Sequence, residues 1–181
     1  MNFRYVLLKE IEKIYIKEKK YIKMKILIFG VSCVGKSTVG NLLSKKINYK
    51  FYDLDEETVK YCNMSIDMFI EFYDSRIERD SIREEILSNI IENESNMVVA
   101  VPPILYNDYI NDVIEQEDII ALELQDSVDN IFSRLIFTDE NGKTLTDSEK
   151  YKNKHKNHYL NEIKEDIEFY KPSFTVDFQI I

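Results

Sequence analysis

A glycine-bordered loop that follows a short apolar run constrains this chain more than any other feature. Residues 26–29 are all apolar, as expected for a parallel strand that is buried on both faces. The next eight residues, from Gly30 to Ser37, fit the spacing G-x-x-x-x-G-K-S. Apolar residues then recur at helical spacing from Val39 to Ile47. The sequence therefore predicts a strand, a phosphate-binding loop and a helix that begins at Lys36.

Such a loop suits a triphosphate because its glycines let backbone N–H groups converge on the phosphates at the positive end of a helix dipole. We expect Lys36 to reach the β and γ phosphates and the Ser37 hydroxyl to coordinate magnesium. Thr38 is expected to contact the α phosphate. The predicted cofactors are ATP and Mg²⁺, bound here by Gly30, Ser32, Cys33, Val34, Gly35, Lys36, Ser37 and Thr38.

The length and composition favour one cytoplasmic domain. A chain of 181 residues, 44% of them apolar, can fill a single buried core. Its apolar runs are far shorter than the roughly 18 residues of a membrane span, and its two cysteines form neither a disulfide framework nor a metal-ligand spacing. A net charge of −9 argues against nucleic-acid binding. We expect no membrane or nucleic-acid partner, and a monomer or weak dimer.

The first 23 residues differ from the rest in charge. They hold seven basic and three acidic residues, a net charge of +4, which leaves −13 for the remainder. Their apolar residues recur near helical spacing, so residues 1–23 are predicted to form a basic amphipathic extension before a main domain at 24–181. The extension is either docked on the domain or lies on a membrane surface, and its interleaved glutamates favour the first alternative.

Strand and helix patterns alternate along the main domain. The expected strands are 26–29, 51–54, 97–101, 119–124 and 174–180. The expected helices begin at Lys36 and continue within 56–94, 105–116, 127–136 and 150–169. This alternation predicts an α/β fold of three layers, a five-stranded parallel sheet with helices on both faces.

Residues 35–43 read G-K-S-T-V-G-N-L-L, and residues 51–55 read F-Y-D-L-D. The two segments resemble the shikimate kinase family, whose members have G-K-S-T-V-G-x-x-L-A followed by F-x-D-x-D. Further matches at the family's spacing are Ser65, Ile66, Ile70, Arg79, Leu122, Leu124 and Arg134. The resemblance covers residues 24–181. It implies a P-loop kinase with a lid at about 137–150, which transfers the ATP γ-phosphoryl group to a small-molecule hydroxyl, shikimate or another.

The resemblance also implies roles for residues outside the loop. Asp53 would act near the magnesium through water, and Asp55 would contact the substrate hydroxyl and accept its proton, as carboxylates at this edge of a sheet are placed to do. Arg79 would clamp the substrate carboxylate, and Arg134 would flank the adenine. In the alternative reading, Asp55 is a helix N-cap and Arg79 a surface arginine. The predicted sites are catalytic at Lys36, Asp53, Asp55 and Arg79, and metal-binding at Ser37 and Asp53.

The chain departs from the family at the end of the third strand and in the lid. The family has a glycine triplet where this chain has Val101-Pro102-Pro103, and two prolines remove two N–H donors. No arginine follows Arg134, so Lys143 is the lid cation expected to contact the nucleotide, with Lys171 a further substitute near the last strand. A run of basic residues after the lid is either catalytic or a solvated helix face: Lys150, Lys152, Lys154, His155, Lys156 and His158.

Three functions are compatible with these patterns. A small-molecule kinase related to the shikimate kinases accounts for the loop together with Asp53, Asp55 and Arg79. A nucleotide-binding protein with a decayed or regulatory function accounts for the two prolines. A nucleoside or nucleotide kinase shares the loop, but its lid usually brings several arginines to the phosphates. The acceptor, the oligomeric state and the role of residues 1–23 are left open by the sequence.

Overall fold

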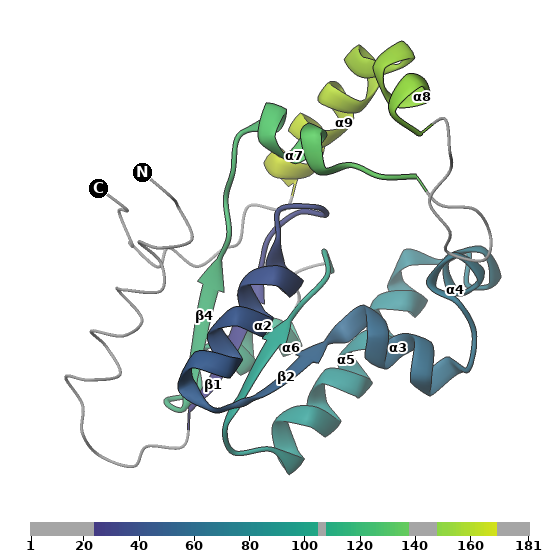
Figure 1. Cartoon of the computed structure of the whole chain (residues 1–181). Coiled ribbons are helices and arrows are strands. Elements are labelled where there is room, and N and C mark those ends of the chain that lie inside the picture. The colour runs from purple at the N-terminus through teal and green to yellow at the C-terminus, as the bar shows by residue number, and fades with distance from the viewer. Residues whose placement is uncertain (1–23, 105–107, 138–147, 170–181) are drawn as a thin grey trace.

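The computed structural model describes residues 24–104, 108–137 and 148–169, and within them the strands form one parallel sheet (Figure 1). Its order is β2-β3-β1-β4. The strands are β1 (Lys25–Phe29), β2 (Lys50–Asp53), β3 (Met97–Ala100) and β4 (Ile119–Glu123). The described sheet thus has four strands where the sequence predicted five, and the fifth predicted strand, 174–180, lies outside the described residues.

Helices separate the strands as the alternation predicted. They are α2 (Lys36–Ile47), α3 (Leu54–Cys62), α4 (Ile66–Phe72), α5 (Arg76–Asn93), α6 (Asp108–Ile114), α7 (Val128–Arg134), α8 (Ser148–Lys154) and α9 (Lys156–Phe169). Three of these helices, α4, α5 and α7, begin after a serine whose hydroxyl accepts a backbone N–H bond from the first turn. The single helix expected over 150–169 is two helices, because the chain turns at His155.

Two hydrophobic clusters give the domain its three layers. Along β1, Ile26 and Ile28 belong to the cluster that α2, α7 and α9 cover, whereas Leu27 and Phe29 belong to the one covered by α5 and α6. This division follows from the strand period of two. All four side chains are at most 2% exposed, and burying each one stabilises the fold by about 1.5–3 kcal/mol.

The strand register brings the candidate site residues to one edge of the sheet. Phe29 pairs with Glu123 at the end of β4, and Asp53 pairs with Ala100 at the end of β3. Because the strands are parallel, their C-terminal ends share this edge, where α/β sheets bind ligands. The phosphate loop is therefore a neighbour of Asp53, at the end of β2, and of Asp55, which follows it.

The helices α7, α8 and α9 stand above this edge (Figure 1). Lys152 of α8 is only 3% exposed and donates to the backbone carbonyls of Ser133 and Leu135 at the end of α7. It also pairs with Glu149 at 2.6 Å. Most of the predicted lid, together with Lys143, lies outside the described residues. None of the described helices has the length and apolarity that crossing a membrane requires.

Candidate functional site: a phosphate loop beside an aspartate pair

The loop after β1 has the backbone of an anion cradle. Gly30 and Gly35 have φ values of 137° and 110°, and Cys33 adopts a left-handed φ of 59°. A Cβ at Gly30 would lie 2.6 Å from the carbonyl oxygen of Leu124, so glycine is required there for space as well as for conformation. At Gly35, where a Cβ would meet nothing within 4 Å, conformation alone requires it.

Lys36, the first residue of α2, lies over this loop. Its Nζ donates to the carbonyl oxygens of Gly30 at 2.8 Å and Val31 at 3.0 Å. Burial lowers the pKa of Lys36 to about 8, although the nearby carboxylates of Asp55 and Asp53 oppose the shift. The ammonium group is thus held against the loop by two backbone carbonyls. Its predicted contact with the β and γ phosphates stays a prediction.

Ser37 and Asp53 are brought together although they lie 16 residues apart in the chain. The Ser37 hydroxyl donates to Oδ2 of Asp53. Oδ1 of the same carboxylate accepts the backbone N–H of Asp55 at 3.1 Å, which makes Asp53 the N-cap of α3. The alternative reading of Asp55 as the N-cap was wrong, because α3 begins at Leu54, two residues earlier than that reading required. A hydroxyl and a carboxylate side by side are the oxygen donors that Mg²⁺ prefers.

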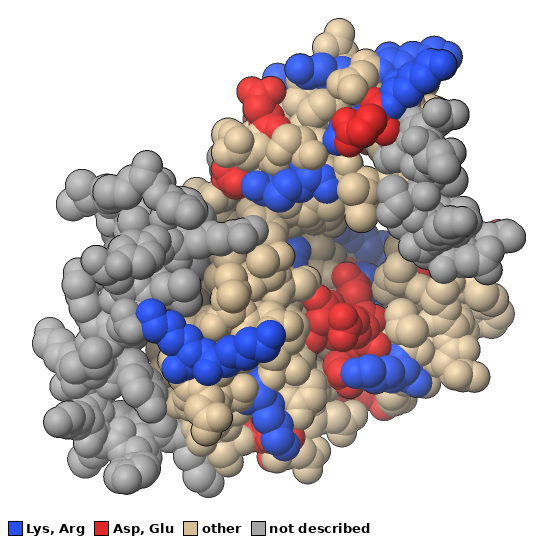
Figure 2. Space-filling view, in the orientation of Figure 1, with Lys and Arg blue, Asp and Glu red and all other residues tan. Residues whose placement is uncertain are grey.

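Asp55 lies in the first turn of α3, where its carboxylate meets an arginine that the sequence analysis did not select. Arg83 of α5 donates from NH2 to Oδ1 of Asp55 at 2.9 Å. Burial raises the pKa of Asp55, while Arg83 and Lys36 oppose the shift. Figure 2 shows acidic side chains gathered over the start of α3, at the rim of a hollow beneath α7 and α9.

Arg79 occupies a different place from Arg83, although both lie on α5. Its NH1 donates to the backbone carbonyls of Ile70, Tyr73 and Asp74, at and beyond the end of α4. The guanidinium group therefore closes the turn between α4 and α5. Its predicted contact with a substrate carboxylate stays a prediction.

Arg134, at the end of α7, lies against the phosphate loop. Its Nε donates to the carbonyl oxygen of Cys33 at 2.9 Å, and its NH1 pairs with Asp126 at 2.8 Å. This position beside the loop is compatible with the predicted adenine contact. Burial raises the pKa of the Cys33 thiol, so the depressed pKa that would mark a reactive cysteine is not found here.

Two further segments that the sequence analysis singled out are the end of β3 and the basic run after the lid. Val101 donates its N–H to Ile28, and Pro102, which has no N–H, is buried behind it. Of the basic run, Lys152 is a buried structural residue, as described above. The part of the chain that the structure describes contains no cluster of three or more side chains suited to a metal ion.

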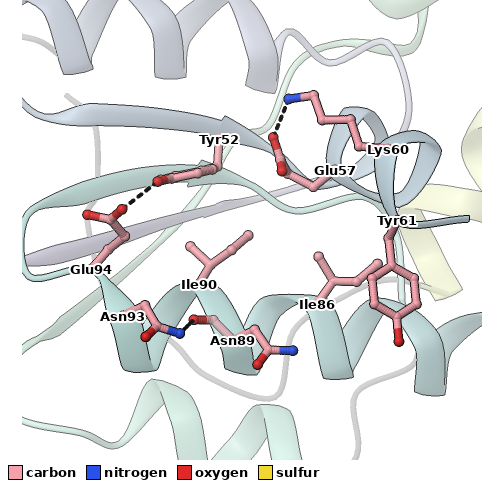
Figure 3. Close-up of a pocket in the computed structure, with 9 residues that line it drawn as sticks. All are labelled: Tyr52, Glu57, Lys60, Tyr61, Ile86, Asn89, Ile90, Asn93 and Glu94. Atoms are coloured by element: carbon pink, nitrogen blue, oxygen red, sulfur yellow. Dashed lines mark hydrogen bonds and ion pairs between the residues drawn. The ribbon is translucent and has the colours of Figure 1, made fainter. Parts of the chain in front are cut away.

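A separate groove of about 420 Å³ lies between α3 and α5, away from the phosphate loop (Figure 3). Its floor is apolar at Ile86 and Ile90. Its rim holds satisfied polar pairs: the Tyr52 hydroxyl donates to Glu94 at 2.7 Å, and Lys60 pairs with Glu57 at 2.6 Å. The lining residues lack a phosphate-binding backbone, so the candidate site is the loop edge and not this groove.

Comparisons with known families point the same way as this geometry. The family model described as shikimate kinase matches residues 32–173. A shikimate kinase of Aquifex aeolicus is 40% identical over 77 residues, 42% of this chain and 45% of that protein. One of Macrococcus caseolyticus is 26% identical over 62% of this chain and 66% of that protein. The chain therefore aligns with between about half and two thirds of the length of these two relatives.

Solved structures support the fold. A shikimate kinase from Bacteroides thetaiotaomicron superposes with a TM-score of 0.63 at 18% identity, over 81% of each chain. A shikimate kinase from Acinetobacter baumannii in complex with shikimate has a TM-score of 0.56 at 16% identity, over 79% of this chain and 82% of that one. At such identities the likeness establishes a shared architecture of sheet and helices.

Proposed function

The chain belongs to the shikimate kinase family, and we propose that it transfers the γ-phosphoryl group of ATP to a hydroxyl of a small molecule. One observation carries the proposal. Lys36, the Ser37–Asp53 pair and Asp55 meet at the C-terminal edge of a parallel sheet, beside a loop whose glycines have positive φ values. Phosphoryl transfer needs three such parts: a cation that binds the phosphates (Lys36), oxygen donors for a metal ion (Ser37 and Asp53) and a carboxylate that faces the acceptor (Asp55).

The nucleotide half of the proposed site uses the loop and the start of α2. Backbone N–H groups from Ser32 to Thr38 and the Lys36 ammonium would bind the phosphates. The Ser37 hydroxyl, with Asp53 behind it, fits a magnesium ion. That ion, when bound with ATP, would neutralise phosphate charge. Arg134 would lie on the adenine side, since it already contacts the loop at Cys33.

The acceptor half uses Asp55. Its side chain is 44% exposed, so a substrate hydroxyl has access to the carboxylate. Asp55 would accept the hydroxyl proton as that oxygen bonds to the γ phosphorus and the bond from phosphorus to the β-phosphate oxygen breaks, releasing ADP. Lys36 is close enough for its charge to lower the pKa of Asp55, and it would stabilise the negative charge of the transferred group.

We propose shikimate or a related hydroxy acid as the acceptor, and a cytoplasmic enzyme that is a monomer or weak dimer without membrane or nucleic-acid partners. The net charge of −9 supports the last point. Two features favour the second candidate, a nucleotide-binding protein with a regulatory role: Pro102 and Pro103 stand where the family has glycines, and Arg79 is bonded to main-chain carbonyls.

The experiment that separates these candidates measures ADP release from magnesium-ATP. The acceptor panel contains shikimate, related hydroxy acids, sugars and nucleosides, and Lys36→Ala is the blank. Acceptor-dependent ADP release that the blank lacks would support the kinase. If ATP binds but no acceptor raises ADP release, the regulatory candidate replaces it.

A further inference from the structure

We propose that Arg83 is a positioning residue of the acceptor site, which holds one carboxylate oxygen of Asp55 so that the other is presented to the acceptor hydroxyl. The inference deepens the proposed kinase activity and rests on it. It gives to Arg83 a role that neither the sequence pattern nor the family resemblance assigned to any residue.

The contact itself joins two helices. Arg83 on α5 and Asp55 on α3 are 28 residues apart in the chain, and NH2 of Arg83 lies 2.9 Å from Oδ1 of Asp55. Within the described residues, Oδ2 of Asp55 has no hydrogen bond or ion pair. A carboxylate with one oxygen bonded and the other free has a fixed orientation and a lone pair to offer.

Arg83 is held in place by contacts other than that with Asp55. Its residue surface is 8% exposed, and its guanidinium carbon lies 5.4 Å from the centre of the Phe69 ring on α4. A second carboxylate, that of Asp80, lies 3.9 Å from NH1. Helices α3, α4 and α5 therefore all contribute to the orientation of this one side chain, as a positioning role requires.

The hydrogen bonding of Arg83 is incomplete. Its Nε is buried without a hydrogen-bond partner among the described residues. A buried donor left unpaired costs about 1–3 kcal/mol, so an arginine chosen for stability alone would be expected to satisfy it. The side chain is instead arranged so that its NH2 reaches Asp55, which favours a role in the site over a role in the core.

Arg79 is not equivalent to Arg83. Arg79 lies one helical turn earlier on α5, and its NH1 donates to three backbone carbonyls around the end of α4. In this chain the arginine bonded to the catalytic carboxylate is therefore the one at position 83. The two arginines therefore have different roles: Arg79 closes the turn between α4 and α5, and Arg83 orients Asp55.

The test is a kinetic cycle on the full chain with magnesium-ATP and the acceptor that supports turnover. We expect Arg83→Met to lower kcat about 30-fold, with a KM for ATP within about twofold of the wild type, because only the acceptor half is disturbed. Arg83→Lys should recover part of the loss, since lysine keeps a donor but lacks the planar fork. Lys60→Met, which removes an exposed cation paired with Glu57 on α3, is the matched control and should leave kcat unchanged.

The decisive comparison places Arg83→Met in an Asp55→Asn background. If Arg83 acts through Asp55, the second substitution should change kcat less than about twofold there. A 30-fold loss in both backgrounds, or an unchanged kcat for Arg83→Met alone, would overturn the proposal. Binding of magnesium-ADP by each variant shows that the variant is folded. If Arg83→Met does not bind magnesium-ADP, Arg83→Lys replaces it in both backgrounds. A wild type without any acceptor-dependent ADP release would reject the kinase and the role of Arg83 together, whereas turnover with an unaffected Arg83→Met rejects only the latter.

Discussion

The phosphate loop and the proposed acceptor half of the site share one edge of the sheet but are built in different ways. The loop is contiguous, and its shape comes from backbone conformations at Gly30, Cys33 and Gly35. The proposed acceptor half is assembled from side chains on separate helices, such as Asp55 and Arg83, which are 28 residues apart in the chain. The loop is formed by consecutive residues, so its sequence motif is intact. In the acceptor half, the packing of the helices decides which side chain contacts Asp55.

The largest effect is expected from the loop lysine. Lys36→Met should lower kcat/KM by a factor of about 1,000 or more, because it removes the charge that we propose stabilises the transferred phosphoryl group. The measurement is ADP release with the best acceptor. Lys45→Met, on the exposed face of the same helix, is the control and should behave as the wild type. Equal activity of the two variants would show that the loop lysine has no part in transfer.

The next effect should be confined to the acceptor half. Asp55→Asn is expected to lower kcat by a factor of about 100–1,000, because the amide cannot accept the hydroxyl proton. The affinity for magnesium-ADP, measured by calorimetry, should stay within about twofold of the wild type, since among the described residues the Asp55 side chain is bonded to Arg83 and not to a residue of the loop. A comparable loss of nucleotide affinity would show that the two halves of the site are not separate.

The two loop glycines should differ in their contribution to stability. Gly30→Ala is expected to lower the free energy of unfolding by about 3 kcal/mol, because the new Cβ would combine an unfavourable φ with a clash against the carbonyl of Leu124. Gly35→Ala meets only the conformational penalty, about 1 kcal/mol. Urea denaturation followed by circular dichroism measures both values. The reverse order would contradict the observed packing of Gly30 against the carbonyl of Leu124, just after β4.

The smallest expected effect is a dependence of nucleotide affinity on pH. Burial lowers the pKa of Lys36 to about 8, so in the free protein this ammonium loses its proton as the pH rises through 8. Anionic phosphates bind the charged form, and the Kd for magnesium-ADP should therefore be constant below pH 8 and rise about tenfold per pH unit above it. Lys36→Met should show no such rise. A wild-type Kd that stays constant up to pH 9.5 would mean that Lys36 keeps its proton.

Much of the fold could be predicted from the sequence, because strands and helices follow local periodicity. The apolar run before Gly30 is β1, and the helix does begin at Lys36. The break at His155 was missed, since residues 152–158 contain no glycine or proline that would mark the end of a helix. The fifth strand and Lys143 fall outside the described residues and stay predictions.

For the site, the sequence by itself determined the phosphate loop, because eight consecutive residues specify its backbone, with glycines at the two positions whose φ values are 137° and 110°. It also placed Asp53 and Asp55 at the end of β2, since the pattern marks where that strand ends. Only the tertiary structure decided that Asp53 caps α3 and meets Ser37, and that Arg83 is the arginine bonded to Asp55. The sole signal for Arg83 was its position one helical turn after Arg79, on the same face of α5. Which of two such arginines reaches a carboxylate depends on how α3, α4 and α5 pack, and that packing is a property of the whole chain.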